Sequence, residues 1–237
     1  MNNIIGRENE KRTLRQLTQS NEPEFLAVYG RRRVGKTFLI REFFKTVTFF
    51  FEIVGLQSGA LDIQLANFAD ILCKHFPKRK GEAPPHNWNE ALKQLMTEVD
   101  KRNIKGKIVF FFDELPWLAH RKSNFLQALE YLWNSWASKK SNIVVIVCGS
   151  AASWMLKNIV HNKAGLHNRI TRRIRLLPFT LRETEDYLKS RRIRLDQKQI
   201  LDIYLAMGGV PHYLNRLKRA NLLRKTSIRY VLQKRAF

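Results

Sequence analysis

The stretch that decides the fold runs from Phe25 to Thr37 and reads Phe-Leu-Ala-Val-Tyr-Gly-Arg-Arg-Arg-Val-Gly-Lys-Thr. Phe25–Tyr29 is an apolar run of strand length, and Lys36–Lys45 has the composition of an amphipathic helix. Between them, residues 30–37 match the pattern G-x-x-x-x-G-K-[ST], whose glycines let successive backbone amides point at one anion. The stretch therefore predicts a strand, a phosphate-binding loop and a helix.

The residue types in this loop predict a nucleotide site. Lys36 can reach β- and γ-phosphates as a point charge, and the Thr37 hydroxyl can ligate Mg²⁺. The amides at the start of the following helix add their dipole to the same anion site. We expect the whole loop to bind the cofactor: Gly30, Arg31, Arg32, Arg33, Val34, Gly35, Lys36 and Thr37. A basic surface turn between a strand and a helix is the competing interpretation.

The rest of the chain alternates strands with helices as far as Pro178 and is helical beyond it. The expected strands are Phe25–Tyr29, Val47–Val54, Lys107–Phe112, Asn142–Cys148 and Arg173–Leu177, and the expected helices between them are Arg7–Gln19, Lys36–Lys45, Leu61–Phe76, Asn89–Arg102 and Phe125–Ser138. This alternation predicts an α/β protein whose parallel sheet is covered on both faces. Three further helices are expected at Leu181–Arg191, Asp196–Met207 and Tyr213–Leu223. We place a core domain at residues 1–178 and a small helical subdomain at 179–237.

Two carboxylates end the strand that begins at Lys107. In a parallel sheet, ligands bind at the carboxyl ends of strands. Asp113 is therefore suited to hold Mg²⁺, and Glu114 to polarise a water that attacks the γ-phosphate. Ser150 follows the next strand and could bond the γ-phosphate or that water. The competing interpretations are two acids at a surface strand end and a serine in an ordinary turn.

Composition excludes several classes of protein. The chain has 237 residues, of which 44% are hydrophobic, so it is not a disordered basic tail. The sequence has no apolar run of 18 residues or more, and its N-terminus lacks the pattern of a secretory signal. The two cysteines, Cys73 and Cys148, have no metal-ligand or disulfide spacing. We therefore expect a protein of the reducing cytoplasm with no membrane partner.

The charge is large and uneven. The formal net charge is +23, and residues 161–237 contribute +14 of it through 19 Lys and Arg against 5 Asp and Glu. Arg191, Arg192 and Arg194, with Lys218 and Arg219, make up the main clusters. A surface of this kind can contact DNA or another polyanion through phosphates, and a merely solvated face is the equal alternative.

Six motifs in order give the chain a family resemblance: Met1–Glu8, Val28–Thr37, Phe111–Leu118, Val147–Ser153, Gly165–Phe179 and Met207–Pro211. Together they resemble the archaeal-type ATPases of the AAA+ and STAND group of P-loop NTPases, over residues 3 to about 215. The resemblance implies ATP and Mg²⁺ as cofactors, hydrolysis of ATP, and movement of a helical lid against the core. A homo-oligomer or a partner protein is also implied.

The same resemblance implies further site residues and a strand order. It implies a P-loop fold with an additional strand, five in all, in which the strand bearing Ser150 lies between the phosphate-loop strand and the Asp113 strand. The first motif and the lid are expected to enclose the adenine base through Ile5, Gly6, Arg7 and Pro211. Arg169 falls where the family carries a trans-acting or sensing arginine. Arg172 and Arg173 are rivals for that role, and a solvated basic flank is the alternative.

One departure from the family concerns the C-terminus. Relatives usually continue past the lid into a winged-helix segment and often a nuclease-like region, whereas this sequence ends at Phe237. We therefore expect an ATPase module without that region. A nucleotide-dependent DNA-binding switch that hydrolyses little is the second hypothesis, and a small-molecule kinase is the third.

Overall fold

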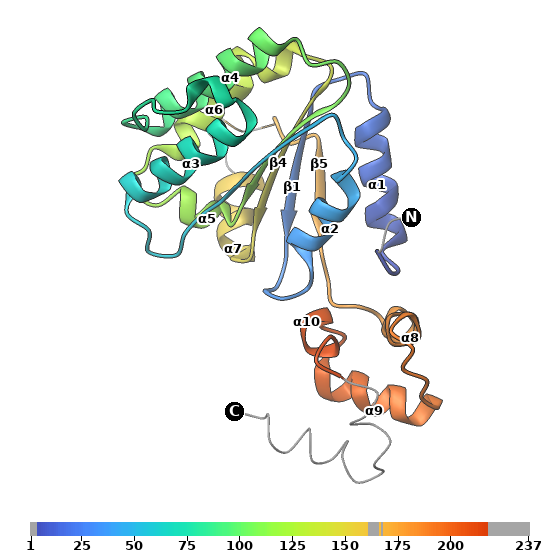
Figure 1. Ribbon diagram of the computed structural model, residues 1–237. Helices are drawn as coiled ribbons and strands as arrows, with labels where there is room; N and C mark the ends of the chain where they lie inside the picture. The colour runs from blue at the N-terminus through green and yellow to red at the C-terminus, as the bar shows by residue number, and fades with distance from the viewer. Residues whose placement is uncertain (1–3, 161–165, 167, 218–237) are drawn as a thin grey trace.

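The fold is built on a five-stranded parallel sheet. In this computed structural model, which describes residues 4–160, 166 and 168–217, the strands are β1 (Glu24–Tyr29), β2 (Phe49–Val54), β3 (Ile108–Asp113), β4 (Ile143–Gly149) and β5 (Arg172–Arg175). Every strand pair is parallel, and the order is β2-β3-β4-β1-β5 (Figure 1). The predicted α/β class is confirmed, and β4 lies between β1 and β3 as the resemblance implied.

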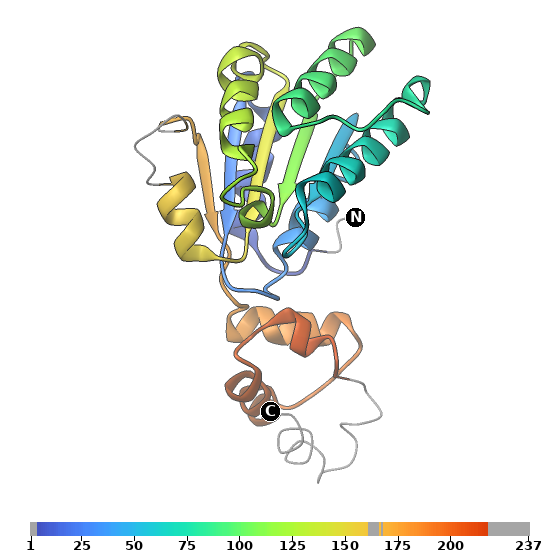
Figure 2. The same ribbon diagram turned by 90° about the vertical axis from the view of Figure 1, so that its left-hand side faces the viewer.

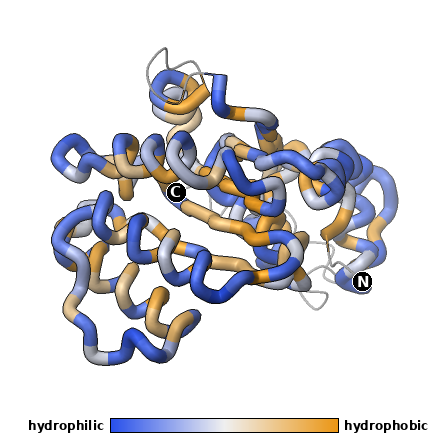
Figure 3. The backbone as a smooth tube through the Cα atoms, turned by 90° about the horizontal axis from the view of Figure 1, so that it is seen from above, coloured by the Kyte–Doolittle hydropathy of each residue, from blue (hydrophilic) through white to orange (hydrophobic). Residues whose placement is uncertain are grey.

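Helices cover both faces of the sheet because its three central strands, β1, β3 and β4, are buried on both sides. On one face pack α1 (Glu8–Gln19) and α2 (Lys36–Phe44), and on the other pack α3 (Leu61–His75), α4 (Trp88–Arg102) and α6 (Phe125–Ser135) (Figures 1 and 2). Along β3, Phe110 and Phe112 join the α3–α4–α6 core, whereas Val109 and Phe111 join the α1–α2 core. Apolar segments accordingly gather in the sheet at the centre of the molecule (Figure 3).

Several element boundaries differ from the sequence predictions. The expected helix Phe125–Ser138 stops at Ser135 and is followed by a 3-10 turn, Ala137–Lys139. Two short helices were not predicted, α5 (Leu115–Leu118) and α7 (Ala152–Met155), the second running into a π-helical turn at Leu156–Val160. Each follows the end of a strand, where too few residues are available to show a helical period.

Of the helix expected at Tyr213–Leu223 the structure describes residues 213–217, and only Tyr213 and Leu214 among them are helical. The structure has α10 at Pro211–Leu214, starting on a proline. Proline suits the first turn of a helix because its fixed φ is helical and its missing N–H has no partner there in any case. Residues 218–223 of the expected helix lie outside the described residues.

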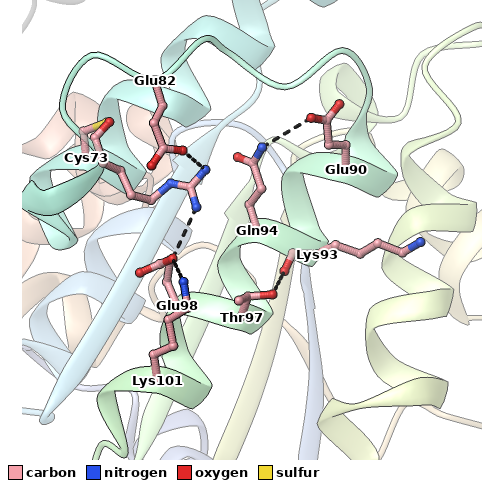
Figure 4. Close-up of polar contacts among 9 residues, drawn as sticks. Cys73, Glu82, Glu90, Lys93, Gln94, Thr97, Glu98 and Lys101 are labelled. Carbon is pink, nitrogen blue, oxygen red and sulfur yellow. Dashed lines mark hydrogen bonds and ion pairs between the residues drawn. The ribbon is translucent and has the colours of Figure 1, made fainter.

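The Pro77–His86 loop is fixed to α4 by ion pairs. The Arg79 guanidinium, in the 3-10 turn Pro77–Arg79, pairs with Glu82 and with Glu98 of α4, and Lys101 donates to the same Glu98 carboxylate (Figure 4). At the start of α4, the Asn87 side chain accepts from the Glu90 amide. This loop lies on the helical layer and does not contribute to the cavity described below.

Beyond β5, the described chain is helical: α8 (Leu181–Ser190), α9 (Gln197–Met207) and α10, which we call the lid. Capping boxes begin α8 at Thr180 and α9 at Asp196, and a separate apolar cluster holds the helices together. The lid lies beyond the edge of the sheet at which β1 ends (Figures 1 and 2). The domain boundary at residue 178 stays a prediction. No helix in the described part of the chain is both long and apolar enough to span a bilayer.

Candidate functional site

The phosphate loop connects β1 to α2, and its two glycines serve different purposes. Gly30 has φ +149°, and a Cβ there would lie 2.2 Å from the carbonyl oxygen of Leu176, so the position needs glycine for the close approach of the chain after β5. Gly35 is the N-cap of α2 with φ +94°, and a Cβ there would meet no atom within 4 Å. Gly35 is therefore required for its backbone conformation, and Gly30 also for space.

Lys36 is held inside the loop by three hydrogen bonds. Its ammonium donates to the carbonyl oxygens of Gly30 and Arg31 and to the hydroxyl of Ser150, each over 3.0 Å. The residue is only 5% exposed. The Lys36 charge is therefore fixed where the phosphate loop ends and α2 begins.

Thr37 and Asp113 form a pair of oxygen ligands. The Thr37 hydroxyl donates to Asp113 Oδ2 over 2.6 Å, and Asp113 is buried at the carboxyl end of β3. Mg²⁺ prefers oxygen ligands and is usually held by one or two carboxylates together with substrate phosphates and water. The described residues contain no cluster of three or more His, Cys, Asp or Glu that could hold a metal by itself. The donor set present thus fits a Mg²⁺ ion that arrives with a phosphorylated substrate.

Glu114 and Ser150 are joined because their strands are neighbours. The Ser150 hydroxyl donates to Glu114 Oε1 over 2.6 Å, and its amide donates to Oε2 over 3.2 Å. Glu114 itself has φ +47° and caps α5, and this left-handed conformation turns the chain sharply after Asp113. Lys36, Ser150 and Glu114 therefore form one hydrogen-bonded chain across the edge of the sheet.

A cavity of about 620 Å³ opens between this edge and the lid. Its walls are Ile5, Arg7, Arg32, Arg33, Val34, Gly35, Lys36, Thr37, Phe38, Leu39, Glu114, Ser150, Phe179, Tyr187, Pro211, His212 and Asn215. Most of the residues predicted from the sequence thus line one cavity. Gly6, Gly30, Arg31 and Asp113 were also predicted but are not among its walls. Asp113 lies next to the cavity through its hydrogen bond to Thr37.

The N-terminal segment is tied to the lid through Glu183. The Arg7 amide donates to Glu183 Oε1 over 2.8 Å, while the same carboxylate accepts from the Thr180 amide. Gly6 packs so closely here that a Cβ would lie 2.6 Å from Glu183 Cγ. Burial pushes the pKa of Glu183 upward, but the hydrogen bonds from Thr180 and Arg7, with the Arg7 charge, outweigh it and hold that pKa below its usual value.

The Arg7 side chain lies in the wall of the cavity. It is 5% exposed, donates to the carbonyl oxygen of Val34 over 3.3 Å and lies 4.6 Å from the centre of the Phe179 ring. Burial lowers the pKa of Arg7, against the opposing effect of the carboxylates of Glu183 and Glu10. Arg7 thereby joins the N-terminal segment, the phosphate loop and the lid.

The lid and the residues that flank it supply site residues that were not predicted from the sequence: Phe179, Tyr187, His212 and Asn215. His212 donates its amide to the Arg33 carbonyl over 3.4 Å, and Arg33 donates to the Tyr213 hydroxyl over 3.2 Å. Burial and the charges of Arg33 and Arg216 lower the pKa of His212. Only the position of His212 next to the predicted Pro211 could have indicated it. Phe38 and Leu39 of α2 were also missed, and they follow directly after the motif.

The structure does not bring Arg169 to the loop. The amide of Thr171 donates to the carbonyl of Phe25, and Arg172 lies opposite Leu26 in the β1–β5 register. Arg169 is therefore at the amino-terminal end of the strands, whereas the loop follows their carboxyl ends. It is exposed there. A role for Arg169 in another copy's site stays a prediction, and Arg172 and Arg173 likewise lie along β5, away from the cavity walls.

The chain matches a known protein family over most of its length and is similar to a curated archaeal protein. A family model described as an ATPase domain predominantly from Archaea matches residues 4–217. The uncharacterised protein MJECL04 of Methanocaldococcus jannaschii is 24% identical over 221 residues, which cover 91% of this chain and 44% of that protein. The chain thus spans less than half the length of this curated relative.

Solved structures share the fold. The Walker-type ATPase PABY2304 of Pyrococcus abyssi has a TM-score of 0.68 at 19% identity, covering 98% of this chain and 71% of that one. A STAND protein of Pyrococcus horikoshii with a tetratricopeptide repeat sensor, PH0952, has a TM-score of 0.54 at 18% identity, covering 90% and 29%. Drosophila ORC, solved bound to DNA, has a TM-score of 0.64 at 15% identity, covering 98% and 58%.

Proposed function

This chain belongs to the family of ATPase domains found predominantly in Archaea, and from that premise we propose that it binds ATP with Mg²⁺ and hydrolyses it to ADP and phosphate. The observation that supports this most directly is the convergence of three adjacent strands on one cavity. Lys36 follows β1, Ser150 follows β4 and Glu114 follows β3, and they form one hydrogen-bonded chain. These hydrogen bonds place Lys36, a phosphate ligand, and Glu114, a carboxylate base, on either side of Ser150.

The residues at the cavity bind different parts of the nucleotide. The loop amides and Lys36 bind the β- and γ-phosphates, and Thr37 and Asp113 hold Mg²⁺. The ion, when bound, offsets negative charge on the phosphate oxygens. The adenine and ribose occupy the part of the cavity lined by Ile5, Arg7 and Pro211.

The hydrolytic step follows from the position of Glu114. A water oxygen forms a bond to the γ-phosphorus while the bond from that phosphorus to the bridging oxygen breaks, and the electron pair leaves on ADP. Glu114 orients the water and accepts its proton. Ser150 donates once to each oxygen of the Glu114 carboxylate, and each oxygen keeps a lone pair that can accept a hydrogen bond from the water.

Lid movement follows from the contacts between loop and lid. Arg33 of the phosphate loop makes two hydrogen bonds to the lid: its guanidinium donates to the Tyr213 hydroxyl, and its carbonyl accepts from the His212 amide. A change in the loop when the γ-phosphate leaves therefore alters the contacts that position α10. We propose that hydrolysis is coupled to movement of the lid through these two bonds.

The test is ATP turnover by the purified chain with Mg²⁺ and without it, in the absence of any acceptor. Release of inorganic phosphate that requires Mg²⁺ is the expected result. Binding of ATP without phosphate release would contradict hydrolysis and favour the switch, and phosphate transfer only to an added small molecule would favour a kinase.

A second function, binding of a polyanion such as duplex DNA, rests on one segment. Residues 169–182 contain five arginines and no acidic residue: Arg169, Arg172, Arg173, Arg175 and Arg182, all of them exposed. Arg191, part of the sequence-predicted cluster, instead donates to the Leu214 carbonyl over 3.1 Å and supports the lid. Reversing the charge of Arg173 and Arg175 should weaken DNA binding, and binding should fall steeply with salt. Absent or salt-insensitive DNA binding would contradict this function.

A further inference from the structure

Three arginines line the cavity, and two of them are committed to other contacts. Arg7 is buried against Phe179 and the Val34 carbonyl. The Arg33 guanidinium donates to the Tyr213 hydroxyl of the lid and lies 5.7 Å from the centre of that ring. The third is Arg32, in the middle of the phosphate loop. Within the described residues its guanidinium makes no hydrogen bond or ion pair and lies over one aromatic ring.

That ring belongs to Trp117, three residues after Glu114. The guanidinium carbon of the exposed Arg32 lies 5.4 Å from the centre of the half-buried indole, a cation–π contact. Contacts of this type are weak at exposed sites, so the guanidinium can leave the ring when a stronger anionic partner arrives.

Trp117 is itself held firmly in place. Its amide donates to the Glu114 carbonyl over 2.9 Å, and its carbonyl accepts from the buried side chain of Gln64 over 3.3 Å. A Cβ on Gly55 would lie 3.0 Å from Trp117 Cβ, so the strand connection after β2 packs against it. Arg32 therefore rests on a fixed surface beside the carboxylate that is to activate water.

The Arg32 charge thus lies in the wall of the cavity, and among the described residues no hydrogen bond or ion pair holds it. Arg32, Lys36, Ser150 and Glu114 all line the cavity, whereas Arg169 lies at the opposite end of the strands. Transfer of a γ-phosphoryl group spreads negative charge over its oxygens in the transition state, and an arginine supplied there accelerates hydrolysis strongly.

We propose that Arg32 is this arginine, supplied in cis by the phosphate loop. On ATP binding its guanidinium leaves Trp117 and donates to γ-phosphate oxygens, while Glu114 takes the proton of the attacking water. The assignment rests on the proposed ATPase function. Arg32 is then a catalytic residue, and the chemical step needs no arginine from a second copy of the chain.

The test compares the wild-type chain with Arg32→Ala, Arg32→Lys and a surface control, Arg121→Ala, which is exposed and outside the cavity. Arg32→Ala should lower kcat about a thousand-fold or more, while KM and the Kd for ADP change less than about threefold. Arg32→Lys should be intermediate because lysine offers a charge without the planar fork. Arg121→Ala should match the wild type.

A second readout separates catalysis from structure. ADP with aluminium fluoride mimics the transferring phosphoryl group, and the wild-type chain should retain this complex through gel filtration while Arg32→Ala loses it. An unchanged urea midpoint shows that Arg32→Ala is folded. If the wild type hydrolyses ATP and Arg32→Ala keeps its turnover within threefold, the assignment of Arg32 is overturned alone. If the wild type shows no turnover, the proposed function fails and the assignment fails with it.

Discussion

The contact between Gly6 and Glu183 gives a prediction that can be worked out from the structure. Gly6 has φ +61°, and a Cβ on it would lie 2.6 Å from both Glu183 Cγ and Oε1. Gly6→Ala therefore strains the backbone and also displaces the carboxylate that accepts from the Arg7 amide. Gly208 offers a matched control because it has φ +60° and a Cβ there would meet nothing within 4 Å.

The two substitutions differ in expected cost. A left-handed conformation costs an alanine about 1–2 kcal/mol, and both variants should lose this much free energy of unfolding. Displacing the Glu183 carboxylate removes a hydrogen bond to a charged group, which costs about 1.5–3 kcal/mol more. Gly6→Ala should thus lose about 2.5–5 kcal/mol and Gly208→Ala about 1–2 kcal/mol.

Urea unfolding at pH 7 measures both values, with equal m-values required for the comparison. Gly6→Ala should also weaken ATP binding, because Ile5 and Arg7 line the cavity on either side of it. Equal losses of stability in the two variants would show that displacement of the Glu183 carboxylate costs nothing, since backbone strain alone would then account for both.

Three further outcomes are expected. Hydrogen bonds from Thr180 and Arg7 hold the pKa of Glu183 below its ordinary value of 4.5, so the folded state favours the carboxylate. The stability that this carboxylate contributes is therefore complete above about pH 4.5 and is lost as the pH falls through the lower folded-state pKa. Urea unfolding of Glu183→Gln against the wild type should show a loss of stability at pH 7 that shrinks below about pH 4.5. Lys36→Ala removes the cation that faces the phosphates and should weaken ATP binding about 10- to 150-fold by calorimetry, and unchanged affinity would argue against the site. Tyr213→Phe removes the hydroxyl to which Arg33 donates, and it should change the free energy of unfolding by under about 0.5 kcal/mol. It should also alter the difference in protease sensitivity of the lid between the ATP-bound and the ADP-bound chain. Identical digestion patterns for variant and wild type would contradict the coupling.

Much of the site could be predicted from the sequence because its information is local. The glycines, the lysine and the threonine of the loop are adjacent in the chain, and Asp113 and Ser150 each end an apolar run. Since the carboxyl ends of parallel strands share one edge of a sheet, these residues had to lie near one another. The resemblance added the strand order that makes Ser150 and Glu114 hydrogen-bonded neighbours.

What escaped prediction depends on contacts between distant segments. Glu183 meets Arg7 across 176 residues, and no periodicity indicates such a pair. The position of Arg169 depends on the register of β5 against β1, which the sequence alone leaves open. The stacking of Arg32 on Trp117 depends on the short helix α5, whose four residues show no helical pattern.

We propose that Glu114 activates water in an ATP site that Lys36 and Thr37 form. This role of Glu114 is tested most directly by ATP turnover and ATP binding of Glu114→Gln, measured beside the wild type and beside Glu22→Gln, an exposed glutamate outside the cavity. We expect Glu114→Gln to bind ATP with wild-type affinity and to lose turnover by about 100-fold or more, while Glu22→Gln is unchanged. Wild-type turnover by Glu114→Gln at full ATP occupancy would contradict it.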